Sequence, residues 1–343
     1  SVVLSASHLD NKQGQILAGT MTLDVRDVSN DLGRLQAGTL SLTSDNYRSQ
    51  GGVLLALDTT GQALTLEVGS ELANTGNAII ESRSGDITLK TTTLDNTSGR
   101  INLTSNGQLN LTAETLDNQS GQLVTEGSLQ VGARHLANNQ GYIQGAQLAI
   151  HATNIENQAG TLVATGSSLS LVSIEAIDNR NGLVQSRGTL ALDAAGFDNT
   201  RGVIVGERLQ LALDHFTNID GLLQGREIDL ELPDFDNTGG TLYATAADGQ
   251  GLSLKTSGTF DNRSGTLLSA ADLNLDSLEV DNRAGQLVAG ARMDIRRAAF
   301  NNEAGLVQSG SALSLELASF NNRKGALILG DDAGSELTIT GDF

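Results

Sequence analysis

The feature that most constrains this chain is a six-residue phrase that returns about every 20 residues from one end to the other. The phrase is an apolar residue, Asp, Asn, two variable residues and Gly, as at residues 9–14 and 116–121. Its asparagine falls at Asn11, Asn30, Asn74, Asn96, Asn118, Asn138, Asn157, Asn179, Asn199, Asn218, Asn237, Asn262, Asn282, Asn302 and Asn322. This regularity indicates one structural unit repeated in tandem, in which each repeat is stabilised by its neighbours.

Each period also contains a Leu-x-Leu alternation, as in Leu109-Asn110-Leu111 and Leu273-Asn274-Leu275. Alternation of period two is typical of strands with one buried face. Such short strands are unstable alone but form long parallel sheets when they stack once per coil. The sequence therefore predicts an all-β fold, a parallel β-helix (β-solenoid) of about 16 coils with roughly 20 residues per coil. Residues 1–343 form a single repeat array, with a degenerate coil near residues 43–62 that has lost the phrase.

The asparagine of the phrase is predicted to point inward at the turn. There it can bond the asparagine one coil away, at the ~4.8 Å strand spacing, and form an amide ladder. The ladder residues are Asn96, Asn118, Asn138, Asn157, Asn179, Asn199, Asn218, Asn237, Asn262, Asn282, Asn302 and Asn322. A Gly stands three residues after all of the phrase asparagines except Asn74, and we expect it to supply a positive φ at the turn.

The residue two places before each asparagine is always apolar, and in the C-terminal half it is mostly Phe. Aromatic rings at one place of the repeat can offset-stack on successive coils. The predicted stack contains Phe197, Phe216, Phe235, Phe260, Phe300 and Phe320.

Composition excludes several classes of function. The chain has no Cys, so it holds no disulfide or thiolate metal site. Its formal net charge of −19 disfavours binding to nucleic acid. No apolar run approaches the ~20 residues that span a bilayer, so we expect no direct membrane insertion by this segment.

Residues that could support catalysis or metal binding are scattered along the array. His8, His135 and His215 share one place in the repeat but lie many coils apart, too far to share a metal ion. The Asp of the phrase recurs on adjacent coils, but it belongs to an Asx-rich turn where it can bond its own backbone. A weak calcium contact there is a minor alternative. We expect no cofactor and no enzymatic activity.

Interruptions of the repeat are the candidate partner-binding sites, because loops change the surface of a solenoid without disturbing its core. They are Asp45, Asn46, Tyr47 and Arg48 in the degenerate coil, Thr245 to Gly251 with Asp248, and Gly330 to Ser335. A basic spot of Arg292, Arg296 and Arg297 adds a further candidate, and Arg263, Arg283, Glu303 and Arg323 form an exposed stripe. The alternative for the loops is neutral drift, and for the Arg side chains a solvated face.

Ser1 to Leu4 and Phe343 each fall inside a repeat, so we expect the chain to be an excerpt of a longer protein.

The phrases at residues 9–14, 260–265 and 280–285 resemble filamentous-haemagglutinin repeats, including those of contact-dependent growth inhibition exoproteins. The resemblance implies a right-handed β-helical shaft of a very large protein, secreted to a Gram-negative cell surface by an outer-membrane partner. It does not tell whether the parent protein is an adhesin or a toxin.

Three functions follow as hypotheses. The first is a structural shaft segment of a secreted filament used in adhesion or contact-dependent toxin delivery. The second is a segment that itself binds a target-cell receptor or glycan. The third and most remote is a polysaccharide-cleaving β-helix enzyme.

Overall fold

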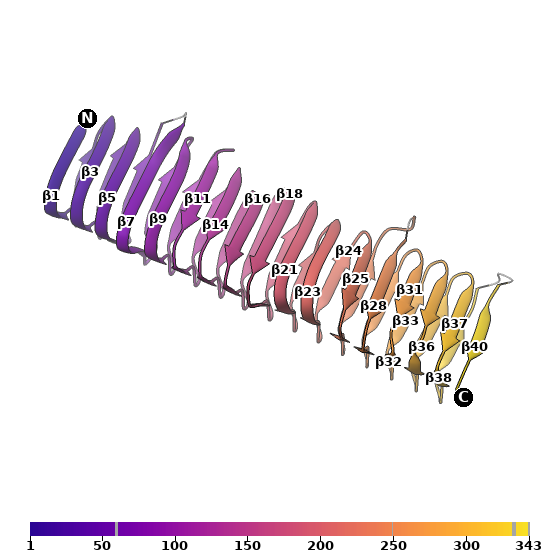
Figure 1. Cartoon of the computed structure of the whole chain (residues 1–343). Helices are drawn as coiled ribbons and strands as arrows, with labels where there is room; N and C mark the ends of the chain where they lie inside the picture. Colours follow the sequence, from indigo (N-terminus) through magenta and orange to yellow (C-terminus); the bar gives the residue numbers. More distant parts are fainter. Residues whose placement is uncertain (59–60, 249, 331–333, 342–343) are drawn as a thin grey trace. The chain divides into compact units, whose positions relative to one another are not determined.

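The computed structural model describes residues 1–58, 61–248, 250–330 and 334–341 (Figure 1). These residues form strands and turns throughout, with no helix among them. None of the described segments could therefore cross a bilayer as a helix. The chain divides into two compact units, Ser1–Glu175 (unit 1) and Ala176–Phe343 (unit 2), which are described separately.

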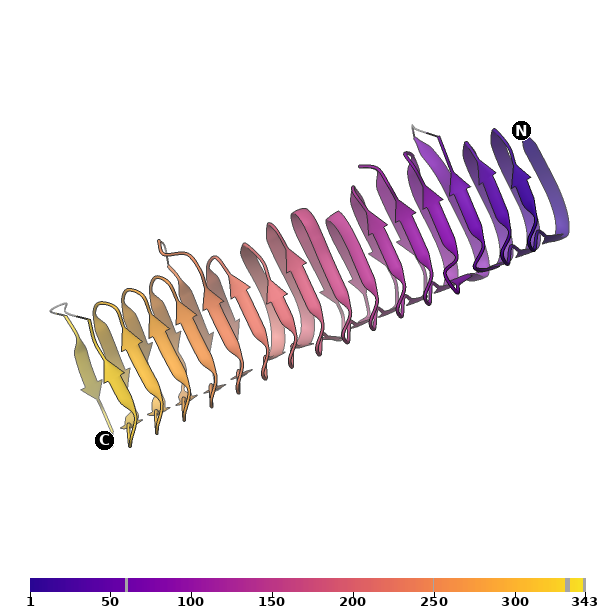
Figure 2. The same ribbon diagram turned by 180° about the vertical axis from the view of Figure 1, so that it is seen from behind.

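In both units each coil has three faces. The first face follows the Gly of the phrase, the second carries the Leu-x-Leu alternation, and the third leads into the next phrase. Successive strands on each face pair in parallel, as Figure 2 shows from behind. This arrangement confirms the predicted parallel β-helix, with coils of about 20 residues.

In unit 1 several strands turn a corner and so serve two faces. The first-face strands are β2 (Gln15–Leu17), β4 (Arg34–Ala37), β6 (Val53–Ala56), β8 (Ile79–Ser82), β10 (Arg100–Leu103) and β13 (Gln122–Thr125). The strands of the second and third faces are β1 (Val2–Asp10), β3 (Thr20–Ser29), β5 (Thr39–Gln50), β7 (Gln62–Thr75), β9 (Asp86–Asp95), β11 (Gln108–Thr112), β12 (Thr115–Asp117), β14 (Ser128–Gly132), β15 (His135–Ala137) and β17 (Asn154–Glu156). Strands β16 (Tyr142–Ala152) and β18 (Thr161–Ser173) run from the first face into the second.

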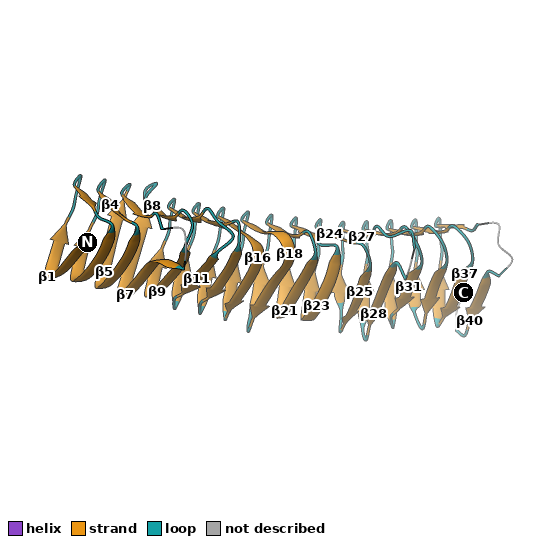
Figure 3. Ribbon diagram, turned by 90° about the horizontal axis from the view of Figure 1, so that it is seen from above, coloured by secondary structure: helices purple, strands orange, loops and turns teal. Residues whose placement is uncertain are grey.

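In unit 2 the faces are more sharply separated, and β24 and β27 can be followed in Figure 3. The first-face strands are β20 (Leu183–Ser186), β22 (Val203–Val205), β24 (Leu222–Gly225), β27 (Thr241–Ala244), β30 (Thr266–Ser269), β33 (Gln286–Ala289), β36 (Leu306–Ser309) and β39 (Ala326–Ile328). The second face has β25 (Ile228–Leu232), β28 (Leu252–Thr256), β31 (Leu273–Asp276), β34 (Met293–Arg296), β37 (Leu313–Leu317) and β40 (Glu336–Ile339), and the third has β19 (Ala176–Asp178), β26 (Phe235–Asp236), β29 (Thr259–Asp261), β32 (Glu279–Asp281), β35 (Ala299–Asn301) and β38 (Ser319–Asn321). Strands β21 (Thr189–Asp198) and β23 (Arg208–Thr217) serve both of the latter faces.

The core is a narrow, mainly aliphatic column, because alternate residues of most strands point inward. Leu109 and Leu111 are buried while Asn110 between them is only half-buried. In unit 2 the Phe side chains form a column, with Phe216 and Phe235 stacked at 5.2 Å and Phe235 and Phe260 at 5.6 Å. Phe197 departs from the expected stacking, because its ring meets that of Phe216 edge-on, at 6.1 Å and 80°. Val280 takes the same place on the coil after that of Phe260, so the column is interrupted before the Phe300–Phe320 pair.

The degenerate coil near residues 43–62 lacks the asparagine of the phrase but keeps its place in the register. Register pairs Tyr47 with Val28 on one side and Leu72 on the other, and pairs Ser49 with Asn74. Tyr47 therefore occupies the apolar place of the phrase and Ser49 the asparagine place, so the phrase is altered and not lost. Tyr47 is only 1% exposed, which rules it out as a partner-binding residue.

The role expected for the repeated Gly is also wrong. The positive φ lies one residue earlier, for example at Ser120, Arg201 and Asp220, with φ of 53°, 55° and 52°. The Gly is required by close approach between coils: a Cβ on Gly221 would lie 2.3 Å from the backbone oxygen of Asn199 on the preceding coil.

Candidate functional site

The asparagines of the phrase form a line of side-chain amides inside each unit, which in unit 1 is interrupted at Ser49. In unit 1 Asn96 Nδ2 donates to Asn118 Oδ1 at 2.7 Å, and in unit 2 Asn199 Nδ2 donates to Asn218 Oδ1 at 2.7 Å. The same bond, at 2.7 or 2.8 Å, joins Asn74 to Asn96, Asn118 to Asn138, Asn138 to Asn157, Asn179 to Asn199, Asn218 to Asn237, Asn237 to Asn262, Asn262 to Asn282, Asn282 to Asn302, and Asn302 to Asn322. These asparagines therefore lie where an amide ladder requires them.

Ladder amides are also tied to backbone carbonyls, both of their own turn and of the next coil. Asn199 Nδ2 donates to the carbonyl oxygens of Gly202 and Leu222, both at 3.2 Å. Asn199 itself has no exposed surface. A buried amide with its donors and acceptor satisfied fixes the register of one coil on the next.

The ladder is broken at Ser49, whose hydroxyl is too short to replace the amide. Asn30 Nδ2 instead donates to the Tyr47 hydroxyl at 3.4 Å and to the Val53 carbonyl at 3.2 Å. On the other side, Asn74 Oδ1 is buried and accepts no hydrogen bond from any described residue. Burial also raises the pKa of the Tyr47 hydroxyl to about 12, so it stays protonated at neutral pH.

Repairing this break should stabilise the protein. The double variant Tyr47→Leu, Ser49→Asn restores the pairing of neighbouring coils and gives Asn74 Oδ1 a donor, for an expected gain of about 1 kcal/mol in the free energy of unfolding. Each single change should destabilise, since Tyr47→Leu leaves a void and Ser49→Asn brings an amide to the place where the Tyr47 hydroxyl meets Asn30. Urea denaturation of the four proteins measures the coupling. If the effects of the two single changes on the free energy of unfolding were additive, the tyrosine hydroxyl and the restored amide would not share one position.

On the third face of unit 2, Asp261 and Asp281 of the phrase form a charge-balanced stripe with the Arg residues two places later. Arg263 and Arg283 pair with Asp261 and Asp281 at 2.7 and 2.6 Å, and Arg263 also lies 3.9 Å from Asp281. Partial burial alone would raise the pKa of Asp281, but the hydrogen bonds from Arg283 lower it overall. Each of these Asp side chains also accepts a backbone N–H two residues on. Of the residues that the structure describes, no three His, Asp or Glu side chains are grouped to hold a metal ion.

The three Arg residues of the predicted basic spot lie at β34, with Arg292 directly before it, Arg296 at its end and Arg297 directly after it. Arg292 and Arg296 both approach Asp294, at 2.9 and 3.8 Å, and Asp294 is itself buried between them. Arg297 pairs with Asp276. Because the positive charges are met by carboxylates of the same protein, the spot offers less net charge to a partner than the sequence suggested.

The exposed residues of the altered coil lie beside a groove at the corner between the second and third faces of unit 1. Asn46 bonds Asp27 at 2.8 Å and Arg48 lies 3.5 Å from Asp31. Asp45 lines the groove, which has a volume of about 550 Å³. Its other polar residues include Ser44, Glu67, Lys90 and Glu114.

Comparison of the sequence with known protein families identifies the repeats. The family described as Haemagglutinin repeat matches residues 84–173, 171–215, 208–264, 237–302 and 294–343, which together span most of the chain. The chain belongs to this family. No curated protein and no solved structure matches it. The resemblance seen in the phrases is thereby confirmed, and the chain is a filament or shaft segment of an adhesin-type protein.

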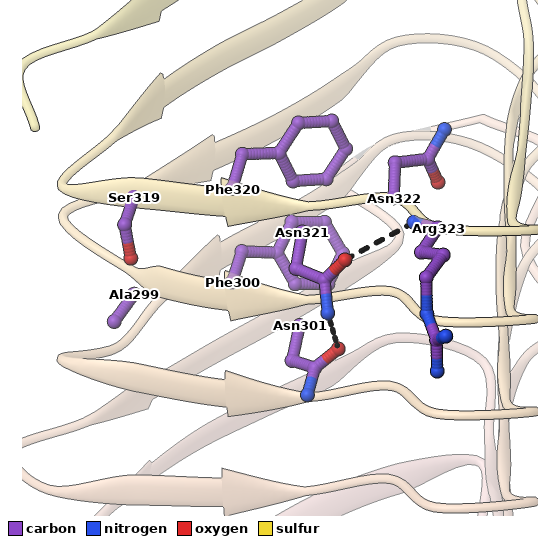
Figure 4. A pocket seen from close by; sticks show the side chains of 8 residues that line it. All are labelled: Ala299, Phe300, Asn301, Ser319, Phe320, Asn321, Asn322 and Arg323. Atoms are coloured by element: carbon purple, nitrogen blue, oxygen red, sulfur yellow. Dashed lines mark hydrogen bonds between the residues drawn. The ribbon is translucent and has the colours of Figure 1, made fainter. Parts of the chain in front are cut away.

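Figure 4 shows a hollow beside the last haemagglutinin-repeat strand described on the third face. It has a volume of about 780 Å³ and is lined by Phe300, Phe320, Asn322 and Arg323, among others. Asn321 Nδ2 donates to Asn301 Oδ1 at 3.1 Å along its wall. Its lining residues are those that one coil presents to the next, so the hollow reflects the stacking surface of the repeat.

The two remaining loops are described in part. Asp248 pairs with Arg226 at 3.1 Å across the loop at Thr245 to Gly251, in which Gly249 lies outside the described residues. In the loop at Gly330 to Ser335, residues 331–333 lie outside the described residues. Ser335 accepts a hydrogen bond from the backbone nitrogen of Leu313 at 3.1 Å. Partner binding by either loop stays a prediction.

Proposed function

We propose that this chain is a passive shaft in a very large exoprotein, which an outer-membrane partner secretes to the bacterial cell surface. The shaft holds an adhesive or toxin-delivery region away from the cell and carries no catalytic activity of its own. Membership of the haemagglutinin-repeat family, whose members are secreted adhesin-like proteins of the cell surface, supports this role.

The observation that carries the proposal is the asparagine ladder. It recurs once per coil, is buried, and joins only neighbouring coils, as between Asn199, Asn218 and Asn237. Each coil is therefore stabilised locally, and the length of the shaft is set by the number of coils.

A shaft of this kind should tolerate removal of whole coils but not of part of one. Excising residues 200–218, a step of 19 residues, would place Asn199 beside Asn237 and restore the ladder. We expect this variant to melt cooperatively, with a thermal midpoint within a few degrees of the parent, and to support export and adhesion when placed in the full-length protein.

The matched control removes residues 200–209, about half a coil, which would put inward side chains out of register. It should melt earlier or fail to fold. Loss of adhesion after the whole-coil excision, with folding intact, would contradict a passive role and indicate that the excised coil itself makes a contact.

The corner groove favours a second candidate function, binding of a receptor or glycan by this segment. Hydroxyl and charged side chains around Asp45 are the groups that hydrogen-bond sugars. Binding of the isolated chain to target cells, lost on Asp45→Ala or Arg48→Ala, would support it. Tyr47 must be left unchanged in that test, because its ring lies in the core. Turnover of polyuronides by the chain would instead support the remote enzyme hypothesis.

A further inference from the structure

The first face of unit 2 differs from its other two faces in having no charge. Its strands are β20, β22, β24, β27, β30, β33, β36 and β39, and all of their residues are described. None of these strands contains Asp, Glu, Lys or Arg. In a chain that carries 40 acidic and 21 basic residues, eight consecutive uncharged strands single out one surface.

Two columns of outward side chains cover this surface, which we call the uncharged face. One column is Leu183, Val203, Leu222, Thr241, Thr266, Gln286, Leu306 and Ala326, and the other is Gln185, Val205, Gln224, Tyr243, Leu268, Val288, Gln308 and Ile328. These side chains are half-buried or exposed, while the alternate residues, such as Ile204 and Leu242, are fully buried in the core. The uncharged face is thus an open, mainly apolar sheet surface with glutamine amides set among the aliphatic groups.

The second face of unit 2 is built differently. Its outward positions carry Asp229, Glu231, Lys255, Asp276, Asp294, Arg296, Glu316 and Glu336. The third face bears the Asp–Arg stripe. Burying either surface in an interface would desolvate charged groups, which costs several kcal/mol per uncompensated charge. Only the uncharged face avoids this cost.

We propose that the uncharged face is a lateral docking surface for a second copy of this chain. Two molecules of net charge −19 repel each other, and this repulsion opposes contact least where neither presents a charge. The features of the face repeat once per strand spacing, and a second copy offers the same repeat. Glutamine amides both donate and accept hydrogen bonds, which makes the face complementary to itself and suits a closed two-fold pair.

Sedimentation equilibrium over a range of protein concentrations tests this. The wild-type chain should dimerise, and added salt should tighten the dimer because it screens the repulsion between acidic surfaces. The double variant Val205→Lys, Leu268→Lys should dimerise at least about tenfold more weakly, since it buries charge at the interface.

The control is Ser253→Lys, Ser314→Lys on the second face, which changes the net charge by the same amount. Because both variants are less acidic than the wild type, a dimer limited only by net charge would be tightened by both. If the uncharged face is the interface, Val205→Lys, Leu268→Lys should weaken the dimer and Ser253→Lys, Ser314→Lys should tighten it. Matching melting curves would show that both variants fold. A wild-type chain that stays monomeric at all protein and salt concentrations would overturn the proposed docking surface and leave the face to another partner. Equal dimerisation affinities of the two variants would overturn it as well.

Disulfide trapping gives an independent result, because the chain has no Cys of its own. Single Cys variants at Gln185, Gln224, Gln286 and Gln308 are oxidised in parallel with Ser253→Cys on the second face. At least one glutamine position should form covalent dimers well above the control, and dimers at none would contradict the docking surface. The shaft role does not enter this experiment, so the two proposals can fail separately.

Discussion

Gly221→Ala should destabilise the protein by about 3 kcal/mol or more, a large effect for the addition of one methyl group. The new Cβ would lie 2.3 Å from the backbone oxygen of Asn199, 2.6 Å from Asn218 Oδ1 and 2.9 Å from Asn199 Nδ2. Two of these atoms belong to the ladder and the third to the backbone of the preceding coil, so no flexible side chain can move aside. The coils must separate locally, which lengthens the hydrogen bonds between them.

The matched control is Gly132→Ala in β14 of unit 1. A Cβ there would have one neighbour, the backbone oxygen of Leu111 at 3.9 Å, and the φ of Gly132 is not positive. This variant should be neutral, or more stable by about 0.4–1 kcal/mol through the reduced entropy of the unfolded chain. Thermal and urea denaturation of both variants give the comparison. Equal free energies of unfolding of the two variants would show that stacked coils can separate locally without loss of stability.

The repeated Gly also shows where sequence reasoning stops. When a single coil is viewed alone, a Gly three residues after an Asn at a turn indicates positive φ. The structure instead gives the left-handed conformation to varied residues, including Arg201 and Ala284. The requirement for Gly comes from the neighbouring coil, and contact between coils is not visible in local propensity.

Tyr47 illustrates the same limit at a candidate site. A polar tyrosine among Asp45, Asn46 and Arg48 has the composition of an exposed loop. Only the register, which aligns Tyr47 with Val28 and Leu72, shows that it fills the core. Sequence periodicity was sufficient elsewhere, because the spacing of the phrase and of Leu-x-Leu determines both which residues point inward and which coils are neighbours.

The uncharged face was missed although its signal is present in the sequence. The residues four and six places after each asparagine point outward, as with Val203 and Val205 after Asn199. Once outward positions are known, the lack of charge at them through unit 2 becomes informative. Without the structure, the aliphatic residues at these positions cannot be distinguished from the residues of a strand that is buried on both faces.

The second large effect is expected from Asn199→Leu in the middle of the unit 2 ladder. The change removes the bond to Asn218 and the bonds to the carbonyl oxygens of Gly202 and Leu222, and it leaves Asn179 Nδ2 facing a methyl group. Unsatisfied buried polar groups cost about 1–3 kcal/mol each. Because several groups lose partners at once, we expect a loss of at least about 3 kcal/mol in the free energy of unfolding.

Two further variants separate hydrogen bonding from volume. Asn199→Asp keeps the shape but cannot donate at neutral pH, and it places a buried carboxylate against the acceptor oxygens of Asn218, Gly202 and Leu222, so it should be at least as destabilising. Asn274→Leu changes an exposed asparagine of the same unit and should stay within about 0.5 kcal/mol of the wild type. If Asn199→Leu also left the urea midpoint unchanged, the coils would be held together by backbone pairing and aliphatic packing alone. The ladder would then set the register of the coils without adding to the free energy of unfolding. The regular spacing of the coils would have to come from strand pairing.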